Sequence, residues 1–170
     1  DRISPAAPHT LDGSAYMSTA SYNDNGVIID LSQDYEGIQW MQLNVPGSPV
    51  IVEANTVEYR WGSRYTIYTG LPGVVGWNWH QRQQRAIIPS TKITDRVEEI
   101  RQFYLTTDVE ETLHFIEKYQ VAYIIVGQLE NLYYPGEGLE KFRDFNGVYW
   151  NTVFQNETTT IYQVRRSNGS

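Results

Sequence analysis

Two runs of apolar, mostly β-branched residues dominate the hydrophobic pattern. Residues 49–54 read PVIVEA and residues 121–127 read VAYIIVG, with almost no polar alternation. Such runs are typical of strands that are buried on both faces of a sheet. Two further strands are predicted over 148–154 and 158–164, joined by a turn at 155–157.

The segments before and between these strands have apolar residues at helical spacing. Tyr35, Ile38 and Met41 recur at every third position within 33–44, which predicts a helix there. Asp95 and Asp108 are each followed three residues later by Glu, and this capping pattern predicts the start of two more helices.

The order of these elements predicts the fold class. A short helix at 138–145 precedes the last two strands. Buried strands alternating with helices predict an α/β fold, a three-layer sandwich with a mostly parallel sheet and a C-terminal antiparallel hairpin. Residues 1–26 have no sustained period and are expected to be an irregular lead-in or linker, 27–166 a single domain, and 167–170 a tail.

Composition narrows the class of protein. The 170 residues carry 13 Lys and Arg against 20 Asp and Glu, a net charge of -7. An acidic chain argues against nucleic acid as a partner. No apolar run approaches the roughly 20 residues of a membrane-spanning helix. Without cysteine, thiol catalysis and disulfides are excluded, and the 3 His have no metal-binding spacing, so neither a metal nor a cofactor is expected.

Tyrosine and tryptophan are in excess, with 13 Tyr and 5 Trp against 5 Phe. Because these rings have an apolar body and a polar edge, the excess favours binding faces over additional core. Residues 55–89 have no clear period, and an irregular segment of this length is usually functional. Its part from 64 to 85 combines Trp, Tyr, Gly, Arg and His, and we therefore expect the site there.

This segment supplies most of the candidate ligand-binding residues. Glycine allows backbone amides to turn toward an anion, tryptophan stacks on sugar rings, and arginine holds phosphate. The candidates are Arg64, Thr69, Gly70, Trp77, Trp79, His80 and Arg85. A packed loop, in which Trp fills the edge of the core and Arg pairs with acidic residues, explains the same pattern equally well.

Two glutamates follow the buried strands. Glu53 ends the first, and Glu130 lies just past the second. Ligands of open α/β sheets collect at the carboxyl ends of strands, so both are candidate ligand-binding residues, and Glu53 is also a candidate general acid or base. The structural alternative is favoured: Glu53 caps a loop or pairs with Arg60 or Arg64, and Glu130 is satisfied by its surroundings.

Five motifs, in order, resemble those of a known family. They are Leu11-Asp-Gly13, Gly47-x-Pro-Val-Ile-Val-Glu-Ala54, Arg64-x-x-x-Tyr-Thr-Gly-Leu-Pro72, Gly76-Trp-x-Trp-His80, and Lys118-Tyr-x-Val-x-Tyr-Ile-Ile-Val-Gly-x-Leu-Glu130. Over residues 11–164 the chain resembles the C-terminal soluble region of the YYY family of bacterial and archaeal multi-pass membrane proteins. The membrane part of that family resembles GT-C glycosyltransferases, which use polyprenyl-phosphate sugar donors.

The resemblance implies an extracytoplasmic domain beside a membrane-embedded part of the same polypeptide. Its expected role is accessory to sugar transfer, by binding an acceptor glycan or a polyprenyl-phosphate sugar, with the fragment inactive alone and the catalytic residues unknown. The chain begins at Asp1 without a basic and apolar leader, so we expect it to be part of a longer protein. The alternatives are a purely structural docking domain and a soluble hydrolase that uses Glu53 or His80.

Overall fold

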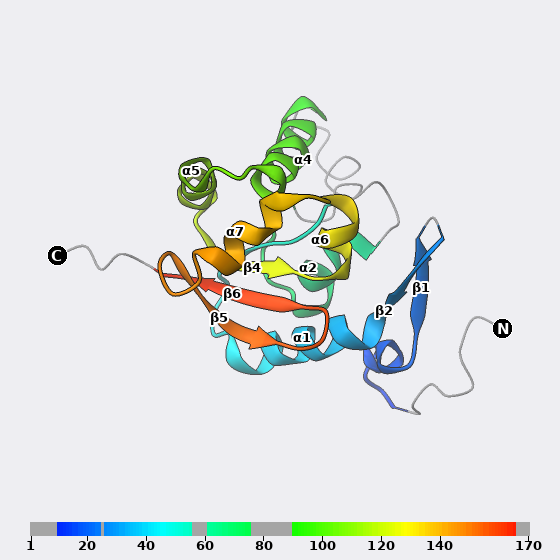
Figure 1. The fold of residues 1–170 in the computed structure, drawn as a ribbon. Coiled ribbons are helices and arrows are strands. Elements are labelled where there is room, and N and C mark those ends of the chain that lie inside the picture. Colours follow the sequence, from blue (N-terminus) through cyan, green and yellow to red (C-terminus); the bar gives the residue numbers. More distant parts are fainter. Residues whose placement is uncertain (1–9, 25, 56–60, 76–89, 166–170) are drawn as a thin grey trace.

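The computed structural model describes residues 10–24, 26–55, 61–75 and 90–165 (Figure 1). Its α-helices (α), 3-10 helices (η) and strands (β) are, in chain order, η1 (Ala15–Ser18), β1 (Ser21–Asp24), β2 (Val27–Asp30), α1 (Leu31–Asn44), β3 (Val50–Val52), η2 (Trp61–Ser63), α2 (Arg64–Thr69), α4 (Ser90–Leu105), α5 (Val109–Tyr119), β4 (Val121–Val126), α6 (Gln128–Tyr133), η3 (Glu137–Leu139), α7 (Glu140–Asp144), β5 (Trp150–Gln155) and β6 (Thr160–Val164).

The main sheet is mixed, with the strand order β3-β4-β6-β5. β3 and β4 pair in parallel, whereas β4 with β6 and β6 with β5 pair antiparallel. The α/β class and the C-terminal hairpin are thus confirmed. The prediction of a mostly parallel sheet is wrong, because the second strand of the hairpin pairs directly with β4, and among the described strands only β3 and β4 pair in parallel.

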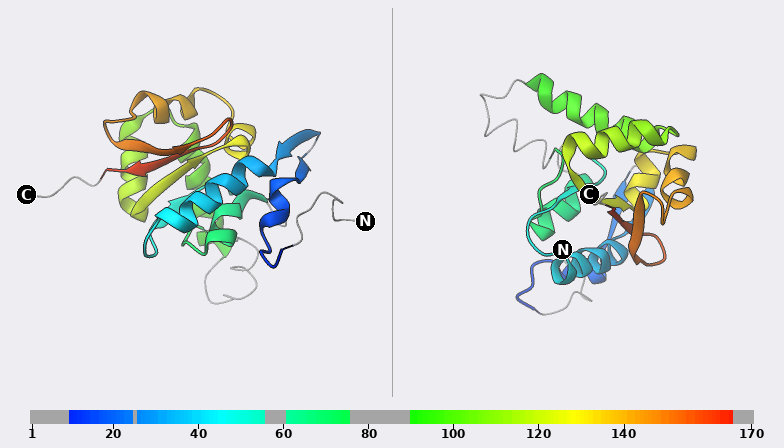
Figure 2. Two further views of the ribbon diagram at one scale, coloured as in Figure 1. Left: turned by 90° about the horizontal axis from the view of Figure 1, so that it is seen from below. Right: turned by 90° about the vertical axis from the view of Figure 1, so that its left-hand side faces the viewer.

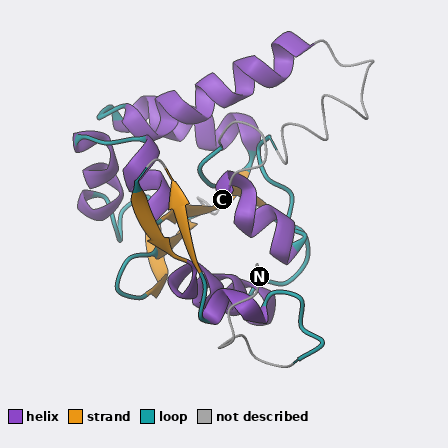
Figure 3. Ribbon diagram, turned by 90° about the vertical axis from the view of Figure 1, so that its right-hand side faces the viewer, coloured by secondary structure: helices purple, strands orange, loops and turns teal. Residues whose placement is uncertain are grey.

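Helices lie on more than one side of this sheet. In Figure 1 and in the right view of Figure 2, α4 and α5 lie above the strands and α1 lies below them. Figure 3 shows the strands near the centre, with helices around them. The expected three-layer arrangement stays a prediction. Within the described residues, no helix has both the length and the apolar character needed to cross a bilayer.

A separate hairpin precedes the main sheet. β1 and β2 pair antiparallel and lie to the right of the main sheet in Figure 1. The elements η1 and β1 fall within residues 1–26, for which the sequence predicts no regular structure. β1 reads Ser-Tyr-Asn-Asp, which lacks both apolar alternation and β-branched residues, so the pattern gives no strand signal. The division into lead-in, domain and tail stays a prediction.

The helix starts depend on capping side chains. The Asp30 carboxylate accepts a hydrogen bond from the Ser32 amide at the start of α1, and Asp108 accepts one from the Glu110 amide at the start of α5. The predicted cap at Asp108 is therefore confirmed. The helix predicted to open at Asp95 begins earlier, at Ser90. An Asp three residues before a Glu is also compatible with a helix interior, so this pattern alone does not fix the start.

The core joins both groups of helices to the sheet. Its fully buried side chains come from α1, from the central strands, from α4, from α7 and from the C-terminal hairpin; they include Ile38, Met41, Ile51, Phe103, Ile124, Phe142, Trp150 and Ile161. The indole nitrogen of Trp150 donates to the carbonyl oxygen of Phe142 at 2.7 Å, so this large side chain is buried with its polar atom paired.

Candidate functional site

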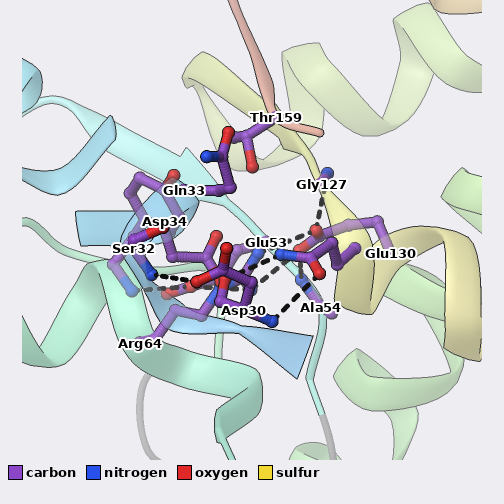
Figure 4. A network of polar contacts seen from close by, with 12 residues as sticks. Asp30, Ser32, Gln33, Asp34, Glu53, Ala54, Arg64, Gly127, Glu130 and Thr159 are labelled. Atoms are coloured by element: carbon purple, nitrogen blue, oxygen red, sulfur yellow. Dashed lines mark hydrogen bonds and ion pairs between the residues drawn. The ribbon is translucent and has the colours of Figure 1, made fainter. Parts of the chain in front are cut away.

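The carboxyl ends of β3 and β4 lie side by side because these two strands run parallel. Glu53 directly follows β3, and Glu130 lies in α6, the short helix that follows β4. Both carboxylates contact the guanidinium of Arg64, the first residue of α2 (Figure 4). The structure therefore brings together three of the residues that the sequence singles out.

Arg64 and Glu130 form a two-pronged ion pair. Nη1 of Arg64 lies 3.1 Å from Oε1 of Glu130, and Nη2 lies 3.0 Å from Oε2. Neither side chain is exposed to solvent. Planar, bidentate pairs of this kind combine two charge-assisted hydrogen bonds with a fixed relative orientation.

Glu130 also holds the ends of the two parallel strands. Its Oε1 accepts a hydrogen bond from the Ala54 amide at 2.7 Å, and its Oε2 accepts one from the Gly127 amide at 2.8 Å. Burial raises the pKa of Glu130, but the charge and hydrogen bonds of Arg64 outweigh this effect and hold it below its ordinary value. Glu130 is thus an ionised brace between β3, β4 and α2.

Glu53 caps α2. Its two carboxylate oxygens accept hydrogen bonds from the amides of Tyr65 and Thr66, at 2.8 and 2.7 Å. One of these oxygens lies 3.8 Å from Nη1 of Arg64. Burial raises the pKa of Glu53 to about 7, against the opposing effects of Arg64 and the two amides. Capping a loop and pairing with Arg64 are the structural roles that the sequence favours for this residue.

A third carboxylate, Asp34 of α1, completes the network. Its Oδ2 lies 2.7 Å from Nε of Arg64, and both side chains are fully buried. Burial raises the pKa of Asp34, opposed by the charge of Arg64. Asp34 is not among the residues predicted from the sequence, although a signal exists: it precedes Ile38 and Met41 by four and seven residues, which places an acid on the buried face of the helix.

One arginine thus faces three carboxylates in the interior. If all three were ionised the group would carry two net negative charges; burial raises the pKa of Asp34 and raises that of Glu53 to about 7. The four side chains are 0–5% exposed, so they are almost completely shielded from solvent. We call Asp34, Glu53, Arg64 and Glu130 the Arg64 network.

Two glycines make room for the Arg64 network. A Cβ on Gly37 of α1 would overlap the hydroxyl of Tyr65, whose ring lies beside the Arg64 guanidinium at 5.1 Å. A Cβ on Gly127 would lie 3.1 Å from Nη2 of Arg64 and 2.9 Å from Oγ1 of Thr159. Both glycines are therefore needed for close approach, α1 to α2 in one case and β4 to Arg64 in the other.

Thr69 and Gly70 end α2. The Thr69 hydroxyl donates to the Tyr65 carbonyl oxygen at 2.6 Å and accepts from the Leu71 amide at 3.1 Å. Gly70 has φ 73°, the left-handed conformation in which helices commonly end at glycine. The other four candidates, Trp77, Trp79, His80 and Arg85, lie outside the described residues.

An aromatic cluster that the sequence analysis did not identify lies against α2. Trp61 stacks on Tyr68 with ring centroids 5.9 Å apart, and its ring also contacts Tyr16 and Tyr22. The hydroxyls of Tyr16 and Tyr68 are hydrogen-bonded at 2.8 Å. All four rings are half-buried, so part of the Tyr and Trp excess forms a surface beside the Arg64 network.

No group of three or more His, Asp or Glu within the described ranges is arranged to hold a metal ion. In the Arg64 network, the guanidinium occupies the space among the three carboxylates and supplies their positive charge. What the geometry provides here is a rigid joint between four elements.

Comparison with known proteins gives a likeness of fold. No protein-family model matches the sequence, and no curated protein matches it. Among solved structures, the chain is similar to the C-terminal globular domain of an oligosaccharyltransferase from Archaeoglobus fulgidus, with a TM-score of 0.51 and 14% identity, over 76% of this chain and 95% of that one. At this identity the similarity concerns the fold.

Proposed function

We propose that this chain is an extracytoplasmic, accessory domain of a membrane glycosyltransferase related to the YYY family. In this proposal it belongs to the same polypeptide as a membrane-embedded catalytic part and does not transfer sugar by itself. The observation that carries the proposal is the fold, since 95% of the C-terminal domain of an oligosaccharyltransferase is matched. The order of motifs in the sequence supports the same class of protein.

Burial of the Arg64 network supports an accessory role over an enzymatic one. A general acid or base must reach the substrate proton within about 3 Å, directly or through one water. Glu53 is 5% exposed, and both of its oxygens already accept backbone hydrogen bonds. Glu53 is therefore poorly placed to act as the general acid or base of the hydrolase alternative, which named Glu53 or His80.

The Arg64 network fixes the position of α2, which precedes the proposed ligand-binding residues in the sequence. Asp34, Glu53 and Glu130 fix α2 to α1 and to the ends of β3 and β4. In the proposal, Trp77, Trp79, His80 and Arg85, which come later in the sequence, engage the ligand. Tryptophan would stack on a sugar ring and Arg85 would pair with the phosphate of a polyprenyl-phosphate sugar.

Saturation-transfer NMR on the isolated chain tests the proposal. The ligands are short-chain polyprenyl phosphates, their sugar conjugates and free oligosaccharides. We expect the polyprenyl phosphates and their sugar conjugates to contact the wild-type chain, to lose these contacts in the double variant Trp77→Ala and Trp79→Ala, and to retain them in Trp61→Phe. Absence of contact with every ligand, or turnover of glycosides by the chain alone, contradicts the proposal.

The aromatic cluster favours one second candidate, a structural docking domain. Trp61 and its three tyrosine neighbours form a half-buried apolar surface beside α2, and Ile67 of α2 is 48% exposed. Surfaces of this kind serve as contacts between protein parts. A docking domain without a ligand predicts no saturation transfer from any sugar or polyprenyl phosphate.

A further inference from the structure

A groove of about 730 Å³ lies at the opposite end of the main sheet from the Arg64 network. It runs between the C-terminal end of α1 and the strands β4, β6 and β5. Its polar and aromatic lining consists of Trp40, Asn44, Tyr123, Asn151, Gln163 and Arg165. We propose that this groove, here called the Trp40 groove, binds a neutral or singly acidic glycan. The choice of a glycan as the ligand rests on the proposed function, whereas the description of the groove itself is independent of that function.

One wall of the groove is a row of side chains across three strands. Tyr123 lies opposite Gln163, and Gln163 lies opposite Asn151, so the three side chains share one face of the sheet. The Gln163 amide donates to the Tyr123 hydroxyl at 3.2 Å. This bond orients the row, while Asn151 and Gln163 remain exposed to solvent.

The other wall comes from the last turn of α1. Trp40 and Asn44 are four residues apart and therefore lie on the same face of the helix. The Asn44 amide donates to the Trp40 carbonyl oxygen at 2.8 Å. The Trp40 ring packs against Phe154 of β5 with ring centroids 5.9 Å apart, which holds the half-buried indole in place.

Charge limits the ligand. Among the described residues that line the groove there is no Asp or Glu, and Arg165 is the single charged one. In a chain with a net charge of -7, a stretch of surface free of carboxylates stands apart from the rest. A cationic ligand would find no partner here, whereas one carboxylate or phosphate on a sugar would meet Arg165.

The remaining chemistry matches sugars. Primary amides donate and accept hydrogen bonds in one plane, as pairs of neighbouring hydroxyls and N-acetyl groups require. An indole held on one side offers apolar area to the C–H face of a sugar ring at little cost in side-chain entropy. The volume also lies within the range of about 300–1,000 Å³ typical of small-ligand sites.

The test is an NMR titration of the ¹⁵N-labelled chain with N,N′-diacetylchitobiose, maltose and glucuronic acid. We expect saturable shifts of the side-chain amides of Asn44, Asn151 and Gln163 and of the Trp40 indole N–H with at least one sugar. Trp40→Ala and Asn151→Ala should each weaken binding at least tenfold. The matched control Trp61→Phe, outside the groove, should bind as the wild type does.

Folding and function are separated by two readouts. Asn151 is exposed, so Asn151→Ala keeps the test valid even if Trp40→Ala unfolds, and unchanged backbone amide signals of Ala54 and Gly127 report an intact fold. Sugar-induced shifts that spare the Trp40 groove, or an absence of saturation at millimolar sugar, overturn this inference. Shifts only with an added peptide, seen on the edge strand β5, overturn it as well.

The two proposals fail independently. One outcome is that polyprenyl-phosphate sugars lose contact in the Trp77→Ala and Trp79→Ala variant while no sugar shifts the signals of the Trp40 groove. In that case the proposed function stands and the groove inference is wrong. If the groove binds sugars but the wild-type chain ignores every polyprenyl phosphate and sugar conjugate, the groove inference stands and the proposed function loses its lipid-linked ligand.

Discussion

Arg64 and Glu130 meet edge to edge in the interior of the domain, with Nη1 to Oε1 at 3.1 Å and Nη2 to Oε2 at 3.0 Å. The two residues lie in different helices, and Glu130 also accepts hydrogen bonds from amides at the ends of β3 and β4. A buried charge that loses its partner remains desolvated and uncompensated, so each member of this pair depends on the other.

Replacement of Arg64 by Met should destabilise the domain strongly. The variant leaves three carboxylates buried without a cation, and removal of one partner from a buried pair costs about 3–5 kcal/mol. Urea denaturation at pH 7 measures the loss. The control is Arg101→Met, because Arg101 pairs with Glu98 on the surface and is 52% exposed; exposed pairs contribute about 0–1 kcal/mol. Equal stability of the two variants would contradict the central place of Arg64.

Gly127→Ala should destabilise the domain, because the added methyl group would crowd the Arg64 network. The added methyl group would lie 2.9 Å from Oγ1 of Thr159 and 3.1 Å from Nη2 of Arg64, and such crowding costs about 1–3 kcal/mol. Gly13→Ala is the matched control, since a Cβ on Gly13 meets no atom within 4 Å. Thermal unfolding of both variants measures the difference. A Gly127→Ala variant as stable as Gly13→Ala would show that the network adjusts freely.

The stability of the domain should depend on the protonation of Glu53. Its pKa is raised from 4.5 to about 7 on folding, so its stabilising contribution is complete below 4.5 and is lost as the pH rises through 7. A shift of this size corresponds to at most about 3 kcal/mol. Glu130, whose pKa is lowered, acts in the opposite sense, and its contribution is lost only in acid.

Urea denaturation of the wild type and of Glu53→Gln between pH 5 and 8 isolates this effect. The amide side chain of Gln does not titrate, so the fall in stability with rising pH should be smaller in the variant than in the wild type. Parallel pH curves for the two chains would assign the dependence to another group.

Lys141 should be essential for the junction between α4 and η3. Its buried ammonium donates to the carbonyl oxygens of Phe103, Thr106 and Gly138, at 2.7, 2.8 and 2.9 Å. Lys141→Met leaves these acceptors unpaired, at a cost of about 1–3 kcal/mol for each that stays dry. Chemical denaturation measures the loss of stability. The control is Lys118→Met, because Lys118 pairs with Glu99 on the surface, where the two side chains are 48% and 36% exposed. A loss no larger than that of Lys118→Met would refute the role.

Much of the fold follows from local patterns. The strand predicted over 121–127 is observed as β4, and the helix predicted over 33–44 is observed as α1 with two more residues at its start. In both cases the signal is a run or a period within one segment. The direction of the strand beside β4 depends instead on which segments meet in space, and there the prediction of a mostly parallel sheet failed.

The helix α6 shows the same limit. Six residues between Gly127 and Tyr134 are too few for a recognisable helical period, so the local pattern predicts no helix there. Its helical form is stabilised by Glu130, which accepts from the Gly127 amide and binds Arg64, 66 positions earlier in the chain. A contact across that distance leaves no trace in the local sequence.

Part of the candidate site could be predicted from the sequence, and the rest depends on contacts between distant segments. Charge alone suggested that Glu53 pairs with an arginine, and this pairing is found. That Arg64 is completely buried could not be predicted, because its burial depends on α1 and on the parallel pairing of β3 with β4. Asp34 was passed over because an acid within a helix is usually exposed.

The Arg64 network also has a consequence for how faithfully the chain folds. Its members come from positions 34, 53, 64 and 130, and the hydrogen bond from the Ala54 amide reaches Glu130 only in the native register of β3 and β4. A slip of one residue would turn β3 over and move Glu53 away from Arg64 and the Ala54 amide away from Glu130. Correct alignment of β3 and β4 is thus a condition for burying the arginine with its charge compensated. Compact states in which the strands are misaligned therefore have a higher free energy than the native state.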